Sequence, residues 1–255
     1  MKIFDTHTHL NDEPFDGREA GEIQKAADLD VVKMNIVGSN YTMNDKAIAL
    51  AERFDNVYAT IGWHPDDAAE FDEKAERYLL SNLTKEKVIA VGEIGLDYHW
   101  MVRPKAEQER VFRRQIQISK QMKVPFQVHT RDALDDTYDI IKSEGIGEKG
   151  AIMHSFSGTF DEAKKFADLG MMISFSGVVT FKKAIAEQEA AAKLPLNQIL
   201  VETDAPYLTP VPFRGKENTP GYTRYVVEKI AELRGISVEE VANATYENAM
   251  RIFGL

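Results

Sequence analysis

The sequence predicts an α/β fold of the (β/α)8 TIM-barrel type, built as one domain over residues 1–255. Three observations predict it: eight short β-branched or aliphatic runs are spread evenly along the chain, segments with helical spacing follow them, and each unit takes about 28 residues. Such alternation is typical of parallel strands joined by crossover helices, and eight units fit a closed barrel better than an open sheet. No internal repeat, linker or block of like charges divides the chain.

The eight predicted strands begin near Ile3, Val32, Val57, Val88, Pro125, Ala151, Met171 and Ile199. The helical segments resemble Glu107 to Met122, where apolar residues recur with a period of about 3.6 among Arg, Gln and Lys. A last helix is predicted over Ser237 to Phe253, with Ser237 and Glu240 as a capping box. Six Pro and Gly residues fall in Pro206 to Gly221. This stretch predicts a long ordered loop over the barrel mouth.

Composition narrows the class of protein. With 44% hydrophobic residues and no cysteine, the chain is neither collagen-like, nor disordered, nor a disulfide scaffold. Its 31 basic and 41 acidic residues give a net charge of −10, so any nucleic-acid binding must be local. The first ten residues do not resemble a signal peptide, and no apolar run approaches the roughly 18 residues of a membrane span. We therefore expect a cytoplasmic protein without membrane contact.

Ionisable residues follow the predicted strands at the ends where a barrel of this kind carries its chemistry. His7 and His9 end the first strand, and side chains two residues apart on a strand share one face, so both imidazoles can point into the mouth. Single candidates end the fourth, fifth, sixth and eighth strands: Glu93, His129, His154 and Asp204.

Six donors are more than one tetrahedral ion needs, so the pattern predicts two adjacent divalent ions. The expected assignment places His7, His9 and Asp204 on one ion, His129 and His154 on the other, and Glu93 between them. Imidazole and carboxylate donors without thiolates suit Zn, Mn, Fe or Ni, and also Mg where phosphate and water complete the shell. Each residue alone has an ordinary structural alternative, such as a solvated strand end or a turn. Their joint placement favours the metal site.

Six blocks of sequence occur in a specific order: FDTHTHL (Phe4 to Leu10), GWHP (Gly62 to Pro65), GEIGLDY (Gly92 to Tyr98), VHTRDA (Val128 to Ala133), HSFSG (His154 to Gly158) and ETDAPYL (Glu202 to Leu208). With these blocks the chain resembles, over essentially its whole length, the TatD-family metal-dependent deoxyribonucleases of the amidohydrolase superfamily. The resemblance implies a metallo-dependent hydrolase barrel that cleaves DNA phosphodiester bonds, as an exonuclease on single-stranded or frayed ends. The family's metal ligands fall on His7, His9, Glu93, His129, His154 and Asp204.

One departure from the family pattern lies in the loop after the eighth strand. Family members often follow Arg-Gly-Lys with Asn-Glu-Pro, whereas here Arg214-Gly215-Lys216 continues with Glu217-Asn218-Thr219-Pro220. The change bears on substrate contacts more than on the hydrolytic chemistry.

The predicted reaction needs no Ser or Cys nucleophile, because two cations lower the pKa of a shared water. Asp204 is the predicted general base as well as a ligand, and a role as ligand alone is the alternative. Glu93 is expected to act in catalysis from its position between the ions.

Several residues are predicted to bind substrate. His64, at the end of the third strand, is expected to contact a phosphate or support a ligand, with a structural role as the alternative. Arg131 offers a planar fork to a phosphate, unless it pairs with Asp132 or Asp135. Tyr98, with His99 and Trp100, is predicted to stack an unpaired base, unless these rings only pack the loop. Weak, salt-sensitive contacts to a DNA backbone are predicted for Arg214, Lys216, Arg103 and Lys105.

Three readings of function remain. The first is the deoxyribonuclease. The second keeps the same centre but hydrolyses a small-molecule ester or amide, or an aminoacyl-tRNA. The third is a non-catalytic, metal-stabilised interaction protein. Residues Gly145 to Gly150 match the letters of a dinucleotide fingerprint, but they follow a helix and precede a strand, so no nucleotide cofactor is predicted. No oligomeric state is predicted.

Overall fold

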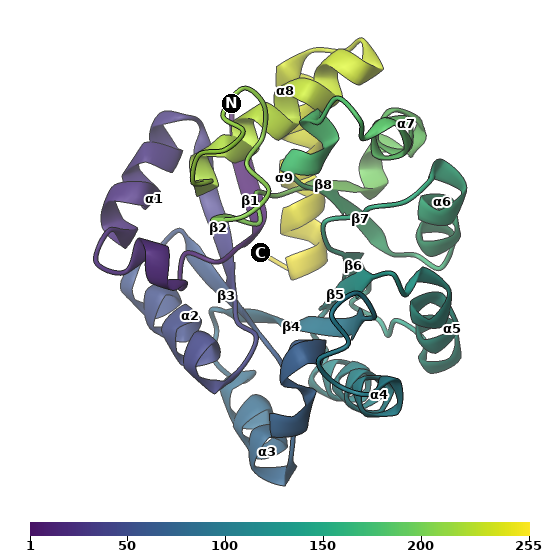
Figure 1. Cartoon of the computed structure of the whole chain (residues 1–255). Helices are drawn as coiled ribbons and strands as arrows, with labels where there is room; N and C mark the ends of the chain where they lie inside the picture. The colour runs from purple at the N-terminus through teal and green to yellow at the C-terminus, as the bar shows by residue number, and fades with distance from the viewer.

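The computed structural model describes all 255 residues and shows eight parallel strands in one sheet, curved into a barrel with the helices outside (Figure 1). The strands pair in chain order, β1 to β8. They are β1 (Ile3–Thr8), β2 (Val31–Val37), β3 (Val57–Ile61), β4 (Val88–Asp97), β5 (Phe126–Arg131), β6 (Ala151–Met153), β7 (Met172–Phe175) and β8 (Ile199–Val201). Each begins within one residue of its predicted position, so the predicted (β/α)8 barrel is confirmed.

The helices are α1 (Glu19–Asp28), α2 (Tyr41–Arg53), α3 (Glu73–Asn82), α4 (Lys105–Met122), α5 (Leu134–Glu144), α6 (Phe160–Asp168), α7 (Ile185–Lys193), α8 (Thr223–Arg234) and α9 (Val238–Phe253). In α4 the buried stripe includes Val111, Phe112 and Ile116, with the helical spacing that the sequence shows. Ser237 caps α9 by accepting a hydrogen bond from the amide of Glu240, at 3.2 Å. The return bond of the predicted capping box is not formed. None of these helices is long and apolar enough to cross a bilayer.

The barrel is closed by the residues that follow β8. The amide of Asp204 donates to the His7 carbonyl at 2.9 Å, and the amide of His9 donates to the Ala205 carbonyl at 2.8 Å. The amide of Thr203 donates to the buried carboxylate of Asp5 at 2.9 Å. We call these hydrogen bonds between β1 and the residues after β8 the seam. The seam fixes the backbone of Asp204 beside His7, in β1, and His9, just after β1.

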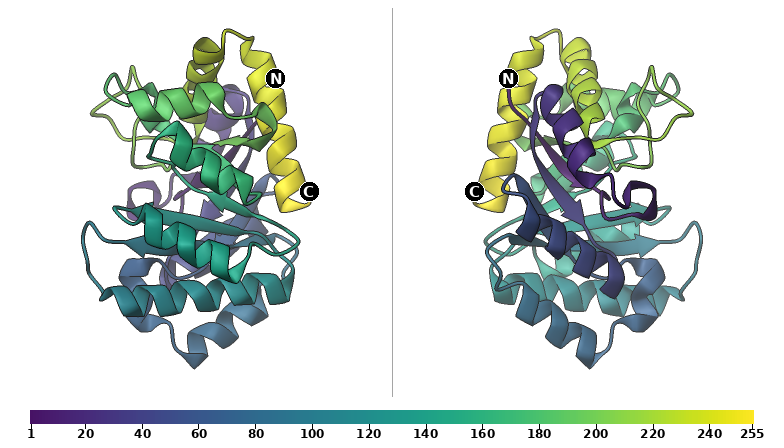
Figure 2. Two further views of the ribbon diagram at one scale, coloured as in Figure 1. Left: turned by 90° about the vertical axis from the view of Figure 1, so that its right-hand side faces the viewer. Right: turned by 90° about the vertical axis from the view of Figure 1, so that its left-hand side faces the viewer.

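The two ends of the barrel differ in chemistry. Helix α9 covers the end where the strands begin, and its Ala249 and Phe253 pack with apolar residues from strand starts such as Phe4. The rings of Phe4 and Phe253 lie 5.7 Å apart. Figure 2 shows α9 along this end, while the loops after β4 and β8 project from the opposite end. The apolar floor leaves the open mouth as the place for polar chemistry.

A buried polar layer separates the floor from the mouth. Asn35 donates to the Thr6 carbonyl at 3.0 Å and to Thr60 Oγ1 at 2.9 Å, and Gln127 also donates to the Thr6 carbonyl, at 2.9 Å. Ser174 donates to Glu202 at 2.5 Å. Buried polar groups cost free energy unless they are hydrogen-bonded. These hydrogen bonds therefore hold the side chains of the layer in fixed positions beneath the mouth.

Gly95 is the point where β4 fits against β5. Its φ is +146°, and a Cβ there would lie 1.9 Å from the carbonyl oxygen of His129. We expect Gly95→Ala to lower the free energy of unfolding by about 2–4 kcal/mol, since backbone strain and a backbone clash add. Denaturant unfolding measures this loss. Gly145→Ala is the control, because Gly145 also has a positive φ but open space around it. Equal losses in the two variants would contradict the clash.

Candidate metal centre

Four donor atoms converge at the barrel mouth from β1, its end, β4 and the residues after β8. His7 Nε2 and His9 Nε2 lie 3.2 Å apart. Asp204 Oδ1 lies 3.7 Å and 3.3 Å from these two nitrogens, and Glu93 Oε2 lies 3.6 Å and 3.8 Å from them. Ligand bonds of about 2.0–2.2 Å place neighbouring donors about 3.0–3.5 Å apart, so this spacing suits one divalent ion.

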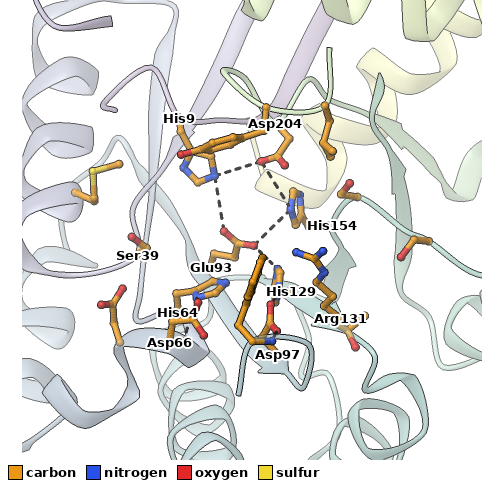
Figure 3. Close-up of a pocket in the computed structure, with 18 of the residues that line it drawn as sticks. His9, Ser39, His64, Asp66, Glu93, Asp97, His129, Arg131, His154 and Asp204 are labelled. Atoms are coloured by element: carbon orange, nitrogen blue, oxygen red, sulfur yellow. Dashed lines mark hydrogen bonds and ion pairs between the residues drawn. The ribbon is translucent and has the colours of Figure 1, made fainter. Parts of the chain in front are cut away.

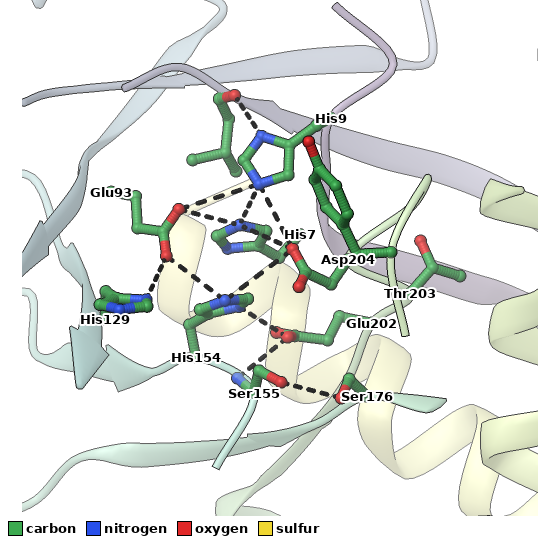
Figure 4. Close-up of polar contacts among 12 residues, drawn as sticks. His7, His9, Glu93, His129, His154, Ser155, Ser176, Glu202, Thr203 and Asp204 are labelled. Carbon is green, nitrogen blue, oxygen red and sulfur yellow. Dashed lines mark hydrogen bonds and ion pairs between the residues drawn. The ribbon is translucent and has the colours of Figure 1, made fainter. Parts of the chain in front are cut away.

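The two oxygens of Glu93 face different histidines (Figure 4). Oε2 faces His7 and His9, whereas Oε1 lies 2.9 Å from His129 Nδ1 and 3.4 Å from His154 Nε2. His154 Nε2 also lies 3.9 Å from Asp204 Oδ1. The six donors predicted from the sequence therefore surround one space, with Glu93 between two pairs of imidazoles. The donors of the second pair are less tightly clustered than those of the first.

Close contacts with oxygen atoms orient two of the imidazoles. His9 Nδ1 lies 3.0 Å from the carbonyl oxygen of Val37, which can only accept, so Nδ1 carries the proton and Nε2 presents a lone pair. His154 Nδ1 lies 2.6 Å from Glu202 Oε1, which likewise directs a Nε2 lone pair at the centre. Glu202 is fully buried and also accepts from the amide of Ser155 at 2.9 Å. Glu202 was not among the site residues predicted from the sequence.

His129 is held by a second carboxylate, Asp97, which was also not predicted as a site residue from the sequence. Its Nε2 lies 3.0 Å from Asp97 Oδ2, so Nδ1 is the atom turned towards Glu93. Burial opposes protonation, but Asp97 and Glu93 raise the pKa of His129 to about 9. Burial also opposes ionisation of Asp97, yet the hydrogen bonds from His129 and the Trp100 amide lower its pKa to about 2. Carboxylates on both sides of the ring therefore stabilise positive charge on His129.

The charge balance fits bound cations. Glu93, Asp97 and Glu202 have exposed side-chain fractions of 6%, 2% and 0%. No Lys or Arg pairs with them; their ion-pair partners are all histidines. Although burial opposes it, the carboxylates of Glu202 and Glu93 raise the pKa of His154 to about 10. Buried negative charge that only histidines oppose is costly, so divalent ions fit this donor set.

Several predicted strand ends were wrong by a few residues. Glu93 was expected to end the fourth strand, but β4 continues to Asp97. His129 lies inside β5, which ends at Arg131, and Asp204 lies three residues beyond β8 with a φ of +57°. The donors still converge, because the strands of a barrel are staggered and the amide of Asp204 is hydrogen-bonded to the His7 carbonyl.

His64 is not the end of β3, which stops at Ile61. It caps the 3-10 helix Pro65–Glu70, where its Nδ1 accepts from the amide of Asp66 at 3.2 Å. Its ring lies 4.5 Å from that of His129, and His64 lines the cavity at the mouth (Figure 3). Burial, with the nearby His129, lowers the pKa of His64 to about 3. His64 is therefore a neutral imidazole whose Nε2 carries its proton.

The cavity at the mouth has a volume of about 840 Å³. Arg131 lines it and forms no ion pair with Asp132 or Asp135, which were its expected alternative partners. Trp100 also lines it, but Tyr98 does not, because the Tyr98 hydroxyl donates to Asp136 at 2.8 Å, in a neighbouring cavity. Of the three aromatic residues considered on this loop, the structure therefore places Trp100 against the site.

The loop after β8 carries its basic residues outside the cavity. The Arg214 guanidinium stacks on Phe181 at 3.8 Å, and Lys216 lies 5.8 Å from the Phe213 ring. Neither lines the cavity. Arg224, which follows the loop in α8, pairs with Asp30 at 2.7 Å. Buried Asn218 anchors the loop by donating to the carbonyls of Thr203 at 3.0 Å and Tyr207 at 2.5 Å.

The barrel with histidines and carboxylates at its mouth defines a class: the chain is a metal-dependent hydrolase by fold and relationship. Residues 4–254 match the family model described as TatD related DNase. The chain therefore belongs to the TatD family.

Similar proteins support both the hydrolase class and the membership of the TatD family. The chain is 43% identical to an uncharacterized metal-dependent hydrolase, YabD, of Bacillus subtilis, over 98% of each chain. It is 38% identical to another, YcfH, of Escherichia coli, over 99% of this chain and 96% of that one. Its structure is similar to that of YjjV, a TatD homolog from Escherichia coli, with a TM-score of 0.92, 30% identity and coverage of 99% and 98%. An organophosphorus hydrolase from Deinococcus radiodurans, at 13% identity and a TM-score of 0.69, shares the fold alone.

Proposed function

We propose that this protein is a deoxyribonuclease that hydrolyses phosphodiester bonds at single-stranded or frayed DNA ends with two divalent ions. The observation that carries the proposal is Glu93, whose two oxygens face separate pairs of imidazoles. The proposed ligands are His7, His9 and Asp204 for one ion and His129 and His154 for the other, with Glu93 between. Zn, Mn, Fe, Ni and Mg are the candidate metals.

When bound, the ions would supply a water of lowered pKa and positive charge for a phosphoryl oxygen. Asp204 is the proton acceptor in this proposal. Its side chain is 14% exposed, against 6% for Glu93 and 2% for Asp97, so it is the carboxylate of the centre that a water reaches most easily. Buried Glu202 and Asp97 position His154 and His129.

Two groups are placed to hold the phosphate. His64 presents a neutral Nε2–H at the cavity, and Arg131 presents a guanidinium that no carboxylate occupies. Arg131 is the only Lys or Arg in the lining, which includes six carboxylates. The cavity's volume of about 840 Å³ lies in the roughly 300–1,000 Å³ range of small-ligand pockets, so it suits the end of a strand and not a length of duplex.

The test is degradation of an end-labelled single-stranded DNA oligonucleotide by metal-loaded protein, with chelated protein alongside. Laddering from one end that the chelator abolishes is the expected result, and it also gives the polarity. The acidic lining favours one competing substrate class, an uncharged ester or amide. Intact DNA across Mg, Mn and Zn, together with hydrolysis of such an ester, would replace the nuclease proposal with that one.

Lys216 is predicted to act on DNA only at long range, because it lies outside the cavity. We expect Lys216→Ala to leave kcat unchanged, to weaken oligonucleotide binding a few-fold at low salt and to lower the salt slope of log Kd by at most about 1. Fluorescence anisotropy across a salt series measures this. Lys149→Ala is the control, because Lys149 lines a cavity among the loops at the opposite end of the barrel. An unchanged salt slope of log Kd in Lys216→Ala would show that Lys216 does not contribute to DNA binding.

A further inference from the structure

Trp100 is a large aromatic side chain left in solvent at the edge of the metal centre. It is 64% exposed and lines the mouth cavity. The next two residues, Met101 and Val102, are 43% and 53% exposed, so three consecutive apolar side chains of this loop face water. An exposed apolar patch beside a reactive centre is typical of a surface that contacts a ligand.

The loop holds Trp100 at a fixed place. Asp97 Oδ1 accepts hydrogen bonds from the amides of His99 at 3.0 Å and Trp100 at 3.1 Å. The other oxygen of the same carboxylate faces His129. The ring of His99 meets that of Trp100 edge-on at 4.8 Å, and His99 Nδ1 lies 3.0 Å from Asp132. Asp97 therefore ties the position of Trp100 to the position of a proposed metal ligand.

Arg131 completes the arrangement. Its guanidinium carbon lies 5.5 Å from the centre of the Trp100 ring, and Arg131 follows His129 by two residues on β5. Figure 3 shows Arg131 beside His129 and Asp97 at the wall of the cavity. An indole face next to a guanidinium that forms no ion pair, both lining the mouth cavity, matches the two parts of a nucleotide: a flat base and an anionic phosphate.

We propose that Trp100 stacks one unpaired nucleobase adjacent to the scissile phosphate, with Arg131 holding that nucleotide's phosphate. This inference rests on the proposed nuclease function and adds its substrate determinant. A base within a duplex has both faces covered by its neighbours, so the Trp100 site selects unpaired ends. Because every base has an aromatic face, it selects for unpaired structure and not for sequence.

A double-mutant cycle tests the stacking. The substrates are a single-stranded oligonucleotide and the same strand with an abasic residue at the cleaved end, and the proteins are wild type, Trp100→Ala and Trp100→Phe. On the intact strand we expect Trp100→Ala to lower kcat/KM by about 5- to 150-fold and Trp100→Phe to retain most of the activity. On the abasic strand the wild type and Trp100→Ala should have equal kcat/KM, because the missing base and the missing indole remove the same stacking interaction. Ile185→Ala, which also truncates an exposed apolar side chain but on α7 and outside the lining, should match wild type on both strands.

A binding measurement separates this inference from the nuclease proposal. The chain has two tryptophans, and Trp63 is fully buried, so quenching of tryptophan fluorescence by a cleavage-resistant phosphorothioate strand reports on Trp100. Saturable quenching with the intact strand, absent with the abasic strand and in Trp100→Phe, supports the stacking even if no DNA is cleaved. Cleavage by wild type with no quenching, and with equal kcat/KM in Trp100→Ala, would overturn the stacking and leave the nuclease standing. If the wild type showed no cleavage and no quenching, both the stacking and the nuclease proposal would be overturned.

Discussion

Asp204→Asn should lower turnover of single-stranded DNA by about 10³-fold or more while the protein remains folded. The substitution replaces an oxygen that lies 3.3 Å from His9 and 3.7 Å from His7 with an amide that can neither accept the water's proton nor match a carboxylate as a ligand. The fold should persist because the seam uses the backbone amide of residue 204 and not its side chain. Asn also tolerates the φ of +57°, which Ala would not do as easily.

Initial rates under saturating metal, with circular dichroism and a melting curve on the same preparation, give the comparison. Asp67→Asn is the matched control, because Asp67 lines the same cavity, and its loss removes one negative charge without removing a proposed ligand. Asp67→Asn should keep activity within a few-fold of wild type. If Asp204→Asn turned over DNA as fast as wild type, Asp204 could not be the proton acceptor, and the proposed mechanism would fail.

The sequence predicted the barrel because its signal is repeated eight times. A β-branched run followed by a helical stripe is local information, and a missed boundary shifts one strand by a residue without changing the order. The same reasoning placed six donors at one rim. The boundaries themselves depended on stagger and on pairing with neighbours, which is why β4 was ended at Glu93 and not at Asp97.

That boundary error explains which supporting residues were missed. Once β4 extends to Asp97, the rule that put His7 and His9 on one face also puts Glu93 and Asp97 on one face. Glu202 directly follows the apolar run of β8, so it too is an ionisable residue at a strand end. What no local pattern provides is their partners: Asp97 meets His129 from β5, and Glu202 meets His154 from beyond β6, so these contacts depend on strand pairing in three dimensions.

Glu93→Gln should remove metal from the protein more completely than any other single change at the mouth. In the proposed centre this carboxylate is the only one whose two oxygens face both sets of imidazoles, at 3.6 Å from His7 Nε2 and 2.9 Å from His129 Nδ1. A glutamine has the same size but offers one weakly basic oxygen and an NH2 group that repels a cation. We expect at least one of two ions per chain to be lost and turnover to fall by at least about 10²-fold.

The measurement pairs metal content after dialysis with melting temperature in metal and in chelator. A ligand that binds only the folded state at 100 times its Kd stabilises by about 2.7 kcal/mol, so wild type should melt several degrees higher with metal, and Glu93→Gln should lose most of this increment. Glu22→Gln is the control: it removes another buried carboxylate, which bonds Lys25 and Thr219 far from the donors, and should keep both ions. Two tightly held ions and an undiminished increment in Glu93→Gln would show that Glu93 does not join the two sites. The six donors would then have to be divided differently between the two ions.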